Sequence, residues 1–320
     1  MRAIAVLVAA LVFSGAAIAQ QGFPNRPLRM VIPWPPGQAT DLVGRVLAQK
    51  MSEVLGQPVV PDNRAGAGGM IGTDFVAKAA PDGYTMLAGS SGPVTVNPLL
   101  QKTAYDVDRD LVPVAKVGLS PYVLVTNQSF PAANAKAFVA LVKANPGKYS
   151  FASSGTGATA HLIAEWFNAL AELKVTHVPY KGSAPALTDV VGGQVAYALE
   201  TVAATMPLVR SGRLRGYGIS VANPTPLAPG IEPLANSLGL TGFDVGAWLG
   251  VMVPAGTPKP VTDRLAAAVE TVMKSPETRE RLATVGLEVD YLPTEEFARY
   301  LKAQQARFAE IIRKGGIRID

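Results

Sequence analysis

The sequence predicts an α/β protein of two domains with largely parallel sheets. Short apolar runs alternate with amphipathic stretches, and glycine- and serine-rich turns follow several of these runs. Strands that alternate with helices are typical of parallel sheets covered by helices. The length of 320 residues suits one large or two medium domains.

The chain begins with the layout of a secretory signal peptide. Met1 and Arg2 form a short positive region, residues 3–18 are almost purely apolar, and residues 17–19 (AIA) supply a small-x-small cleavage site. A membrane anchor is the alternative, but the apolar run is shorter than the ~20 residues that a spanning helix needs. We therefore expect a signal peptide over residues 1–19, its cleavage, and a soluble mature protein in the periplasm.

The composition excludes several classes of site. The chain has no cysteine, which excludes disulfides, thiol catalysis and a lipid-modified cysteine after the signal. The two histidines, His161 and His177, are too few for a histidine-rich metal site. The 29 basic and 24 acidic residues are not clustered with aromatic residues, so nucleic-acid binding is not expected. The mild positive excess favours encounter with anions.

The first third of the chain predicts three strands and two helices. Residues 28–32 are a short apolar run followed by a proline-rich turn, which indicates a buried strand. In the helix that follows, Thr40 is expected to be the N-cap and Gly56 the C-cap. Further strands are expected at residues 58–60 and 84–88, and a second helix through residues 71–79.

The same alternation continues to the C-terminus. Strands are expected at residues 114–117, 123–125, 149–152, 175–178, 195–199, 214–220 and 248–253. Helices are expected at residues 135–144, 158–170, 184–191 and 202–210, from about 259, and from about 294. The proline-rich stretch 223–230 predicts a linker.

Two segments are candidates for crossing between the domains. One lies near Ser120 and Pro121, which are expected to join two short strands, and the other lies at residues 220–223. We therefore expect residues 22–120 plus 224–320 to form one domain and residues 121–223 the other. The alternative is that the region from residue 123 to residue 253 continues one sheet.

Three strand-to-helix turns share one chemistry, at residues 34–40, 89–93 and 153–157. They are rich in glycine, serine and threonine and contain no lysine or arginine. In open α/β sheets ligands bind beyond the carboxyl ends of the strands, where such turns gather. Backbone N–H groups at helix starts and hydroxyl groups can bind a carboxylate. Each turn taken alone could equally serve only as a turn or cap.

Enzymatic interpretations find little support. The run 66–72 (GAGGMIG) resembles a dinucleotide fingerprint, but its third glycine is one position late and no suitable acidic residue follows. No phosphate-binding loop or nucleophile elbow is present. Ser154 and His161 are the only candidate pair for an exported serine hydrolase, and no triad accompanies them. We expect no catalytic residue, no cofactor and no metal.

Six motifs occur in order along the expected mature chain. They are PWPPGQATD (33–41), DNRAGAGGMIG (62–72), AAPDGYT (79–85), ASSGTGATAHL (152–162), HVPYKGSAPALTDVVGGQV (177–195) and PAGTP (254–258). Together they resemble the Bug family of extracytoplasmic receptors associated with tripartite tricarboxylate transporters. Because the motifs cover the whole mature chain, the resemblance is stronger than any single motif.

The resemblance implies a two-domain periplasmic binding protein of type II-like fold, with its ligand cleft between the domains and hinge closure. The ligand is a small organic acid, held by the turns after two strands and partly by ordered water. The implied partners are integral-membrane transporter subunits or a sensor, and we expect a monomer. The implied contacts are Gly37, Gln38, Ala39, Thr40 and Asp41 with Ser153, Ser154, Gly155, Thr156 and Gly157.

Departures from the family pattern single out Gln38 and add Trp34 and Glu200 as candidates, and the third turn adds Ser90 and Ser91. Gln38 replaces a usual glycine and could narrow the pocket, contact the ligand or point away. Trp34 replaces a usual phenylalanine, as an aromatic wall or a core residue. An ionised Glu200 in the cleft would disfavour a second ligand carboxylate and favour an amine or hydroxyl, unless it is a solvated or capping residue. Ser90 and Ser91 represent the third turn, which Pro93 makes less polar. A receptor for a neutral amide or aromatic solute remains an alternative.

Overall fold

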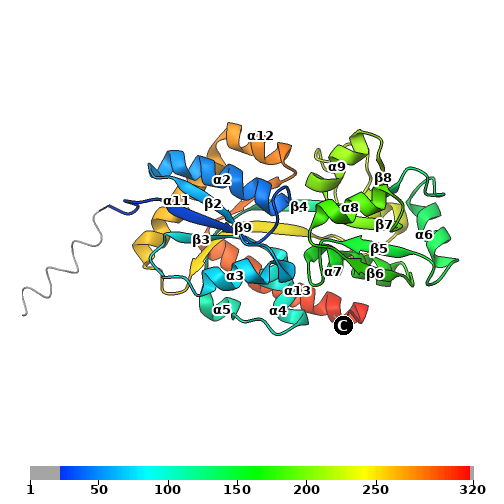
Figure 1. The fold of residues 1–320 in the computed structure, drawn as a ribbon, viewed down its shortest axis with the longest axis horizontal. Helices are drawn as coiled ribbons and strands as arrows, with labels where there is room; N and C mark the ends of the chain where they lie inside the picture. The colour runs from blue at the N-terminus through cyan, green and yellow to red at the C-terminus, as the bar shows by residue number, and fades with distance from the viewer. Residues whose placement is uncertain (1–21, 318–320) are drawn as a thin grey trace, which may run out of the picture.

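The computed structural model describes residues 22–317, so the predicted signal peptide lies outside the described residues. This part of the chain forms two lobes, with the long strands β4 (Leu111–Asn127) and β9 (Gly246–Pro254) running between them (Figure 1). The predicted α/β class is confirmed. No helix among the described residues is both long and apolar enough to cross a bilayer.

The first lobe is built around parallel strands in the order β2-β1-β3. These are β2 (Val59–Asn63), β1 (Leu28–Ile32) and β3 (Thr85–Ser90); β9 continues the sheet antiparallel to β3. β10 (Glu288–Leu292) pairs with β4. The helices of this lobe are α2 (Ala39–Leu55), η1 (Ala67–Gly69), α3 (Met70–Ala77), η2 (Gly92–Val96), α4 (Asn97–Leu100), α5 (Val107–Asp110), α11 (Lys259–Lys274) and α12 (Pro276–Thr284).

The second lobe has strands in the order β4-β7-β5-β6, with β8 also paired to β4. They are β5 (Ser150–Ser153), β6 (Thr176–Pro179), β7 (Tyr197–Thr201) and β8 (Leu214–Ile219); β5 is parallel to β6 and β7. The helices are α6 (Ala135–Lys143), α7 (Thr159–Leu170), α8 (Ser183–Val191), α9 (Val202–Arg210) and α10 (Leu234–Leu238). The terminal helix α13 (Thr294–Gly315) runs beneath both lobes in Figure 1, and Phe308 and Ile311 on it join the second lobe's core.

One strand replaces the two short strands that were expected around Ser120 and Pro121. β4 runs without a turn for 17 residues, pairing with β9 and β10 in its first half and with β7 and β8 in its second. Pro121 still fits this strand because the Ser220 hydroxyl and backbone bond the neighbouring Tyr122, so pairing resumes at once. A single path of hydrogen-bonded strands therefore passes through both lobes.

The predicted domain boundary at residues 223–224 remains a prediction. The packing of the residues that follow it shows where the chain re-enters the first lobe. Leu227 and Ala228 share a core cluster with Val123 and Ile219 of the second lobe. Residues from Leu234 to Ala247 also pack in that lobe's other cluster. The segment after the predicted linker thus packs on the second lobe before β9 leads back to the first.

The predicted cap of α2 is wrong. The helix begins at Ala39, its N-cap is Gln38, and the Gln38 side chain makes no capping hydrogen bond. Thr40 lies one residue inside the helix because Gly37, at φ 84°, already turns the chain. The Gly37 N–H donates to the Asp41 carboxylate at 2.9 Å, so Asp41 stabilises the turn from within the helix.

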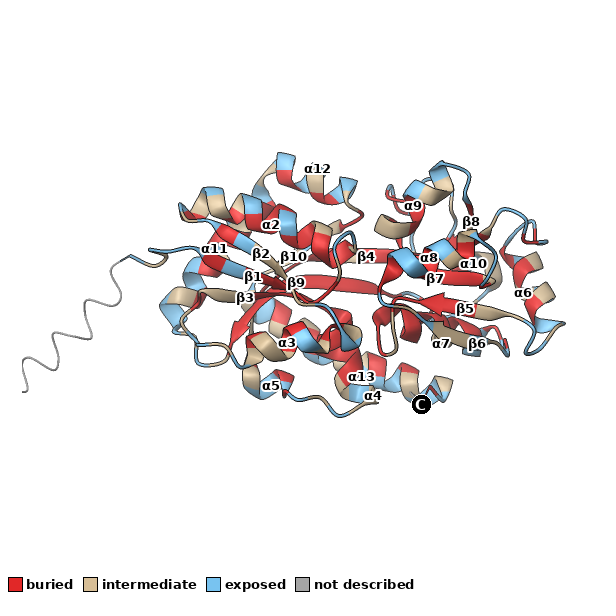
Figure 2. Cartoon of the chain, viewed as in Figure 1, coloured by how far each residue is buried: buried red, intermediate tan, exposed pale blue. Residues whose placement is uncertain are grey.

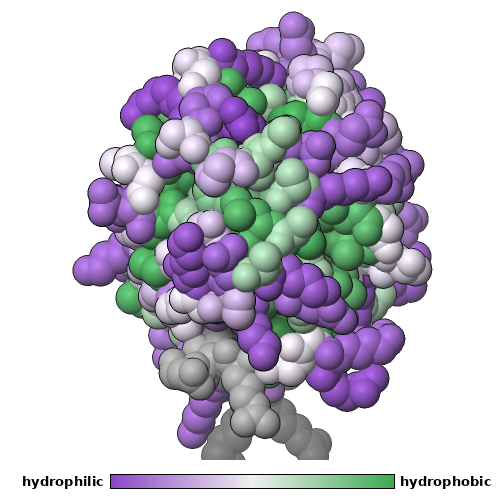
Figure 3. Space-filling view, turned by 90° about the vertical axis from the view of Figure 1, so that its right-hand side faces the viewer, coloured by the Kyte–Doolittle hydropathy of each residue, from purple (hydrophilic) through white to green (hydrophobic). Residues whose placement is uncertain are grey.

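Burial is concentrated along the shared strands. All nine residues of β9 and most of β4 are buried, as the red ribbons in Figure 2 show. The end of the second lobe seen in Figure 3 shows hydrophobic atoms interspersed with hydrophilic ones. Among the described residues the exposed large hydrophobic side chains are scattered over four elements, at Val60, Ile71, Leu99 and Leu170.

The close approach at Gly250 on β9 generates a stability prediction. A Cβ atom there would lie 2.7 Å from the Ala115 carbonyl oxygen of β4 and 2.7 Å from the Phe297 ring. We expect Gly250→Ala to lower the free energy of unfolding by about 1–3 kcal/mol because overpacked strands must shift. Chemical denaturation measures this. Gly192→Ala is the control, since its Cβ would make ordinary contacts, and an equal loss in both variants would contradict the explanation.

Candidate functional site

Loops from both lobes enclose a small hollow where the lobes meet. It offers only about 20 Å³ of free space, and no lysine or arginine is among its lining residues. The lining residues are Trp34, Gln38, Ala39, Thr40, Ser90, Tyr122, Ser154, Thr159, Glu200, Thr201, Ala247 and Leu249. Hydroxyl, amide and aromatic groups therefore dominate this hollow, with one carboxyl group among them.

Two helices, one from each lobe, begin at the hollow. Ala39 and Thr40 open α2 in the first lobe, and Thr159 opens α7 in the second. The N-cap of each helix, Gln38 and Ala158, makes no side-chain capping bond. The first N–H groups of a helix have no partner within the helix and carry the positive end of its dipole. The two helix starts thus present partial positive charge to the hollow, which has no lysine or arginine in its lining.

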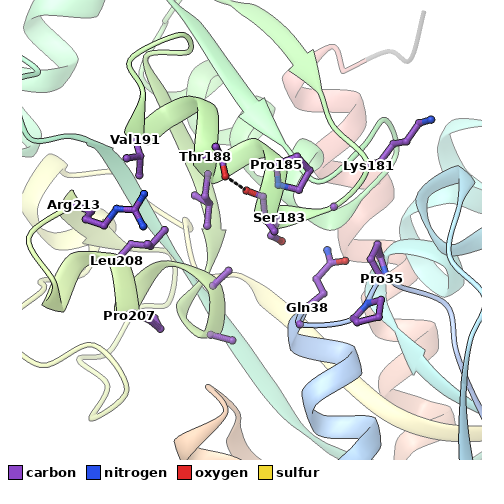
Figure 4. Close-up of a pocket in the computed structure, with 17 residues that line it drawn as sticks. Pro35, Gln38, Lys181, Ser183, Pro185, Thr188, Val191, Pro207, Leu208 and Arg213 are labelled. Atoms are coloured by element: carbon purple, nitrogen blue, oxygen red, sulfur yellow. Dashed lines mark hydrogen bonds between the residues drawn. The ribbon is translucent and has the colours of Figure 1, made fainter.

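Two larger spaces adjoin the hollow. The first, the outer cleft, offers about 420 Å³ and shares Trp34 and Ser154 with the hollow. Its other walls are the glycine-rich run 65–69, Gly155 and Thr156, and the loop 179–182. The second, the groove between α8 and α9, offers about 360 Å³ and shares Gln38 with the hollow. In Figure 4 its sides are mainly apolar, with Arg213 at the α9 end.

Trp34 and Ser90 form one wall of the hollow. The Trp34 indole Nε1–H donates to the Ser90 hydroxyl oxygen at 2.9 Å, and both residues are buried. Because Ser90 accepts this bond, its own hydroxyl proton is free to donate to a ligand. Trp34 is therefore both a buried core residue and part of the hollow's wall, the two roles considered for it from the sequence.

Glu200 lies at the end of β7 with 1% of its surface exposed. Its Oε2 atom accepts a hydrogen bond from the Ser183 hydroxyl at 2.8 Å, whereas Oε1 is buried with no hydrogen-bond partner among the described residues. Burial raises the pKa of this carboxyl. The donors of Ser183 and Thr201 that bond Oε2 oppose the rise, as do the nearby Ser154 hydroxyl and N–H, which form no hydrogen bond to the carboxyl among the described residues. Glu200 is therefore a buried residue that lines the hollow, and it is not a solvated one.

Four candidate residues support the site without lining it. Asp41 accepts hydrogen bonds from the Gly37 N–H, Asn63 Nδ2 and Arg45 Nε, so both of its carboxylate oxygens are bonded within the first lobe. Ser91 accepts from the backbone of Trp248. Ser153 is fully buried, and Gly157 turns the chain at φ 73°. Gly37 borders the groove, while Gly155 and Thr156 border the outer cleft.

The two histidines stack behind the Ser153–Gly157 turn. Their rings are parallel within 8° and 3.8 Å apart. His177 Nε2 lies 2.7 Å from Ser153 Oγ, and His161 Nδ1 accepts from Gly157 N–H at 3.3 Å. Ser154 and His161, the pair considered for the alternative hydrolase, are not hydrogen-bonded to each other among the described residues. The serine that lies within hydrogen-bonding distance of a histidine is Ser153, which is fully buried and so not accessible to a substrate.

Several lining residues were not predicted. Tyr122, Thr201 and Leu249 belong to strands that reach the hollow from both lobes, and Thr159 follows the recognised turn. Tyr122 and Leu249 lie within apolar runs, which gave no polar signal to single them out. Thr159 could have been predicted from the sequence, because it opens the helix after the turn 153–157, which was already expected to contact the ligand.

Comparisons of the whole chain agree with this geometry. The family model described as "Tripartite tricarboxylate transporter family receptor" matches residues 43–317. Protein BugT of Bordetella pertussis is 37% identical over 306 residues, covering 95% of this chain and 94% of that protein. The "UPF0065 protein in tcbD-tcbE intergenic region" of Pseudomonas sp. strain P51 is 38% identical, covering 91% and 86%.

Solved structures resemble the described fold. The periplasmic binding protein BugD is 35% identical with a TM-score of 0.86, covering 92% of this chain and 99% of that one. R. palustris Rpa4515 with adipate is 30% identical with a TM-score of 0.88, covering 92% and 99%. MatC from Rhodopseudomonas palustris with bound malate is 33% identical with a TM-score of 0.83, covering 91% and 100%.

The histidine stack generates a pH prediction. Burial lowers the pKa of His161 to about 4, and burial together with the charge of His161 lowers the pKa of His177 to about 3. The unfolded chain therefore takes up protons near its ordinary histidine pKa of about 6.5, before the folded chain does. The free energy of unfolding should fall as pH drops from about 6.5 toward 4, by at most ~1.4 kcal/mol per pH unit for each histidine.

Thermal or chemical unfolding at a series of pH values measures this dependence, and His161→Gln isolates it. The variant should show a shallower loss of stability than the parent between about pH 6.5 and 4. The same slope in both proteins would contradict the assignment of a depressed pKa to this histidine.

Proposed function

Because the chain belongs to the tripartite tricarboxylate transporter receptor family, we propose that it captures a small organic carboxylate in the periplasm. In this proposal the protein binds its ligand without transforming it, acts as a monomer, and presents the ligand to integral-membrane transporter subunits or to a sensor. The reported ligands of two similar structures, adipate and malate, support a carboxylate ligand.

The observation that carries the proposal is the meeting of two uncapped helix starts at one hollow that has no cation among its lining residues. The N–H groups of Thr40 on α2 and of Ala160 on α7 have no partner within their helices. Such groups bind anions, and a carboxylate is the anion that suits two converging sets of donors and the hydroxyl of Ser90. We assign the ligand carboxylate to this hollow.

The remainder of the ligand is assigned to the outer cleft, which shares Trp34 and Ser154 with the hollow. The wall formed by residues 65–69 offers glycine backbone, which permits close approach. The hollow itself holds about 20 Å³, enough for a water molecule and too little for a carboxylate. Entry therefore requires the lobes to separate and then close, and we place the hinge where β4 and β9 pass between the lobes.

A ligand screen by thermal shift tests the proposal. We expect a few of the mono-, di- and tricarboxylates, amino acids and aromatic acids to raise the melting temperature, because a ligand at a hundred times its Kd stabilises the fold by ~2.7 kcal/mol. Matching amides should have no effect, since they lack the charge. Shifts with amides or neutral aromatics alone would contradict carboxylate binding.

Ser154→Ala separates the receptor from the hydrolase interpretation. Ser154 lines both the hollow and the outer cleft, so the variant should bind the identified acid about tenfold more weakly, the cost of one lost hydrogen bond. Ser129→Ala, at an exposed hydroxyl away from the hollow, is the matched control. Calorimetry measures the affinities. Consumption of the acid by the parent protein, abolished in Ser154→Ala, would contradict a receptor.

A further inference from the structure

Among the residues that line the hollow, three have a polar atom that is buried and unbonded. These atoms are Gln38 Oε1, Glu200 Oε1 and Thr201 Oγ1. A buried polar group without a partner costs free energy comparable to a lost hydrogen bond, and a buried charge costs more. The Gln38 carbonyl oxygen can only accept a hydrogen bond, and so can Glu200 Oε1 while its carboxyl is ionised, so the partner that suits both is a donor.

The other contacts of Glu200 hold it in place for that partner. Its Oε2 atom accepts from the Ser183 hydroxyl at 2.8 Å and from the Thr201 backbone N–H at 3.3 Å. Ser183 opens α8, so the carboxyl group is fixed between two elements of the second lobe. The unbonded Oε1 atom is thereby left for a group that enters the hollow.

A ligand with carboxylate groups alone fits this arrangement poorly. Its carboxylate at the starts of α2 and α7 would share a nearly dry hollow with the Glu200 carboxyl, and like charges at short distance repel strongly there. No lysine or arginine of the hollow's lining could offset that repulsion. A cationic group on the ligand itself would offset that repulsion.

We propose that the ligand carries a protonated primary or secondary amine beside its carboxylate, and that Glu200 is the residue that selects it. This inference rests on the proposed carboxylate receptor function. An ammonium group has up to three N–H donors, enough for Glu200 Oε1 and Gln38 Oε1 together, whereas a hydroxyl has one. A quaternary ammonium has no N–H donor and leaves both oxygens unbonded.

Calorimetric titration with matched acids tests the inference. Each set keeps one carbon skeleton and carries an amino group, a hydroxyl group or hydrogen at the same carbon, such as aspartate, malate and succinate, or alanine, lactate and propionate. Longer and aromatic sets complete the range. In the set that binds best, the amino acid should bind at least about tenfold more tightly than its two counterparts, as expected of a charge-assisted hydrogen bond.

Glu200→Gln keeps the shape of the side chain and removes its charge. It should reduce the preference for the amino acid to below about threefold, mainly by weakening the amino acid. The matched control is Glu232→Gln, an exposed glutamate of the same lobe, which should retain the parental preference. Should Glu200→Gln fail to fold, the parental ratio within the matched sets still decides the question.

The outcomes separate the two proposals. If hydroxy or unsubstituted acids bind as tightly as the amino acids, the inference about Glu200 is overturned and the carboxylate receptor stands. If Glu200→Gln retains the full preference, the amine is recognised elsewhere and the role of Glu200 is overturned. If no acid of any set binds, the proposed function is overturned and this inference with it.

Discussion

Strand β4 pairs with β9 and β10 along its first half and with β7 and β8 along its second, so one buried strand belongs to both lobes. The rest of the structure depends on this pairing. The pairing of β4 sets how far apart the two lobes lie, and thereby the distance between the turn before α2 in the first lobe and the turn before α7 in the second. The proposed opening and closing would bend these strands, and continuous strands can bend while they preserve their hydrogen-bond register. The glycine at position 250, packed against Ala115 and Phe297, lets these strands lie close together.

The walls of the hollow attract charges of opposite sign. Helix starts and hydroxyl groups attract an anion with partial charges, and these cost less to bury than a full cation would. The Glu200 carboxyl then makes the opposite wall of the same space attractive to a cation. A site of this kind favours a ligand that carries both charges over an ion of either sign alone. Asp41 does not disturb this balance, because Gly37, Arg45 and Asn63 occupy its oxygens.

Sequence patterns predicted most elements, because periodic apolar runs and glycine turns report local structure. They placed the starts of α11 and α13 at Lys259 and Thr294, where the structure has them. They did not predict the continuity of β4, because a Ser-Pro pair usually marks a turn. The strand continues through Ser120 and Pro121 because it pairs there with β9 and because Tyr122 is bonded to Ser220. The cap of α2 was misplaced by two residues, at Thr40 where the structure has Gln38, for a similar reason, since the Asp41–Gly37 contact is not visible in composition. The position of Glu200 required the fold, because burial and an unbonded oxygen are properties of packing.

A crystal structure of the mature protein with its best-binding acid tests the central claim most directly. The account predicts one ligand carboxylate within hydrogen-bonding distance of the backbone N–H groups that open α2 and α7, directly or through one water. The remainder of the ligand would lie against Trp34 and Ser154 in the outer cleft. A ligand whose carboxylate lay instead beside Arg213 in the groove between α8 and α9, with the hollow unoccupied, would contradict it.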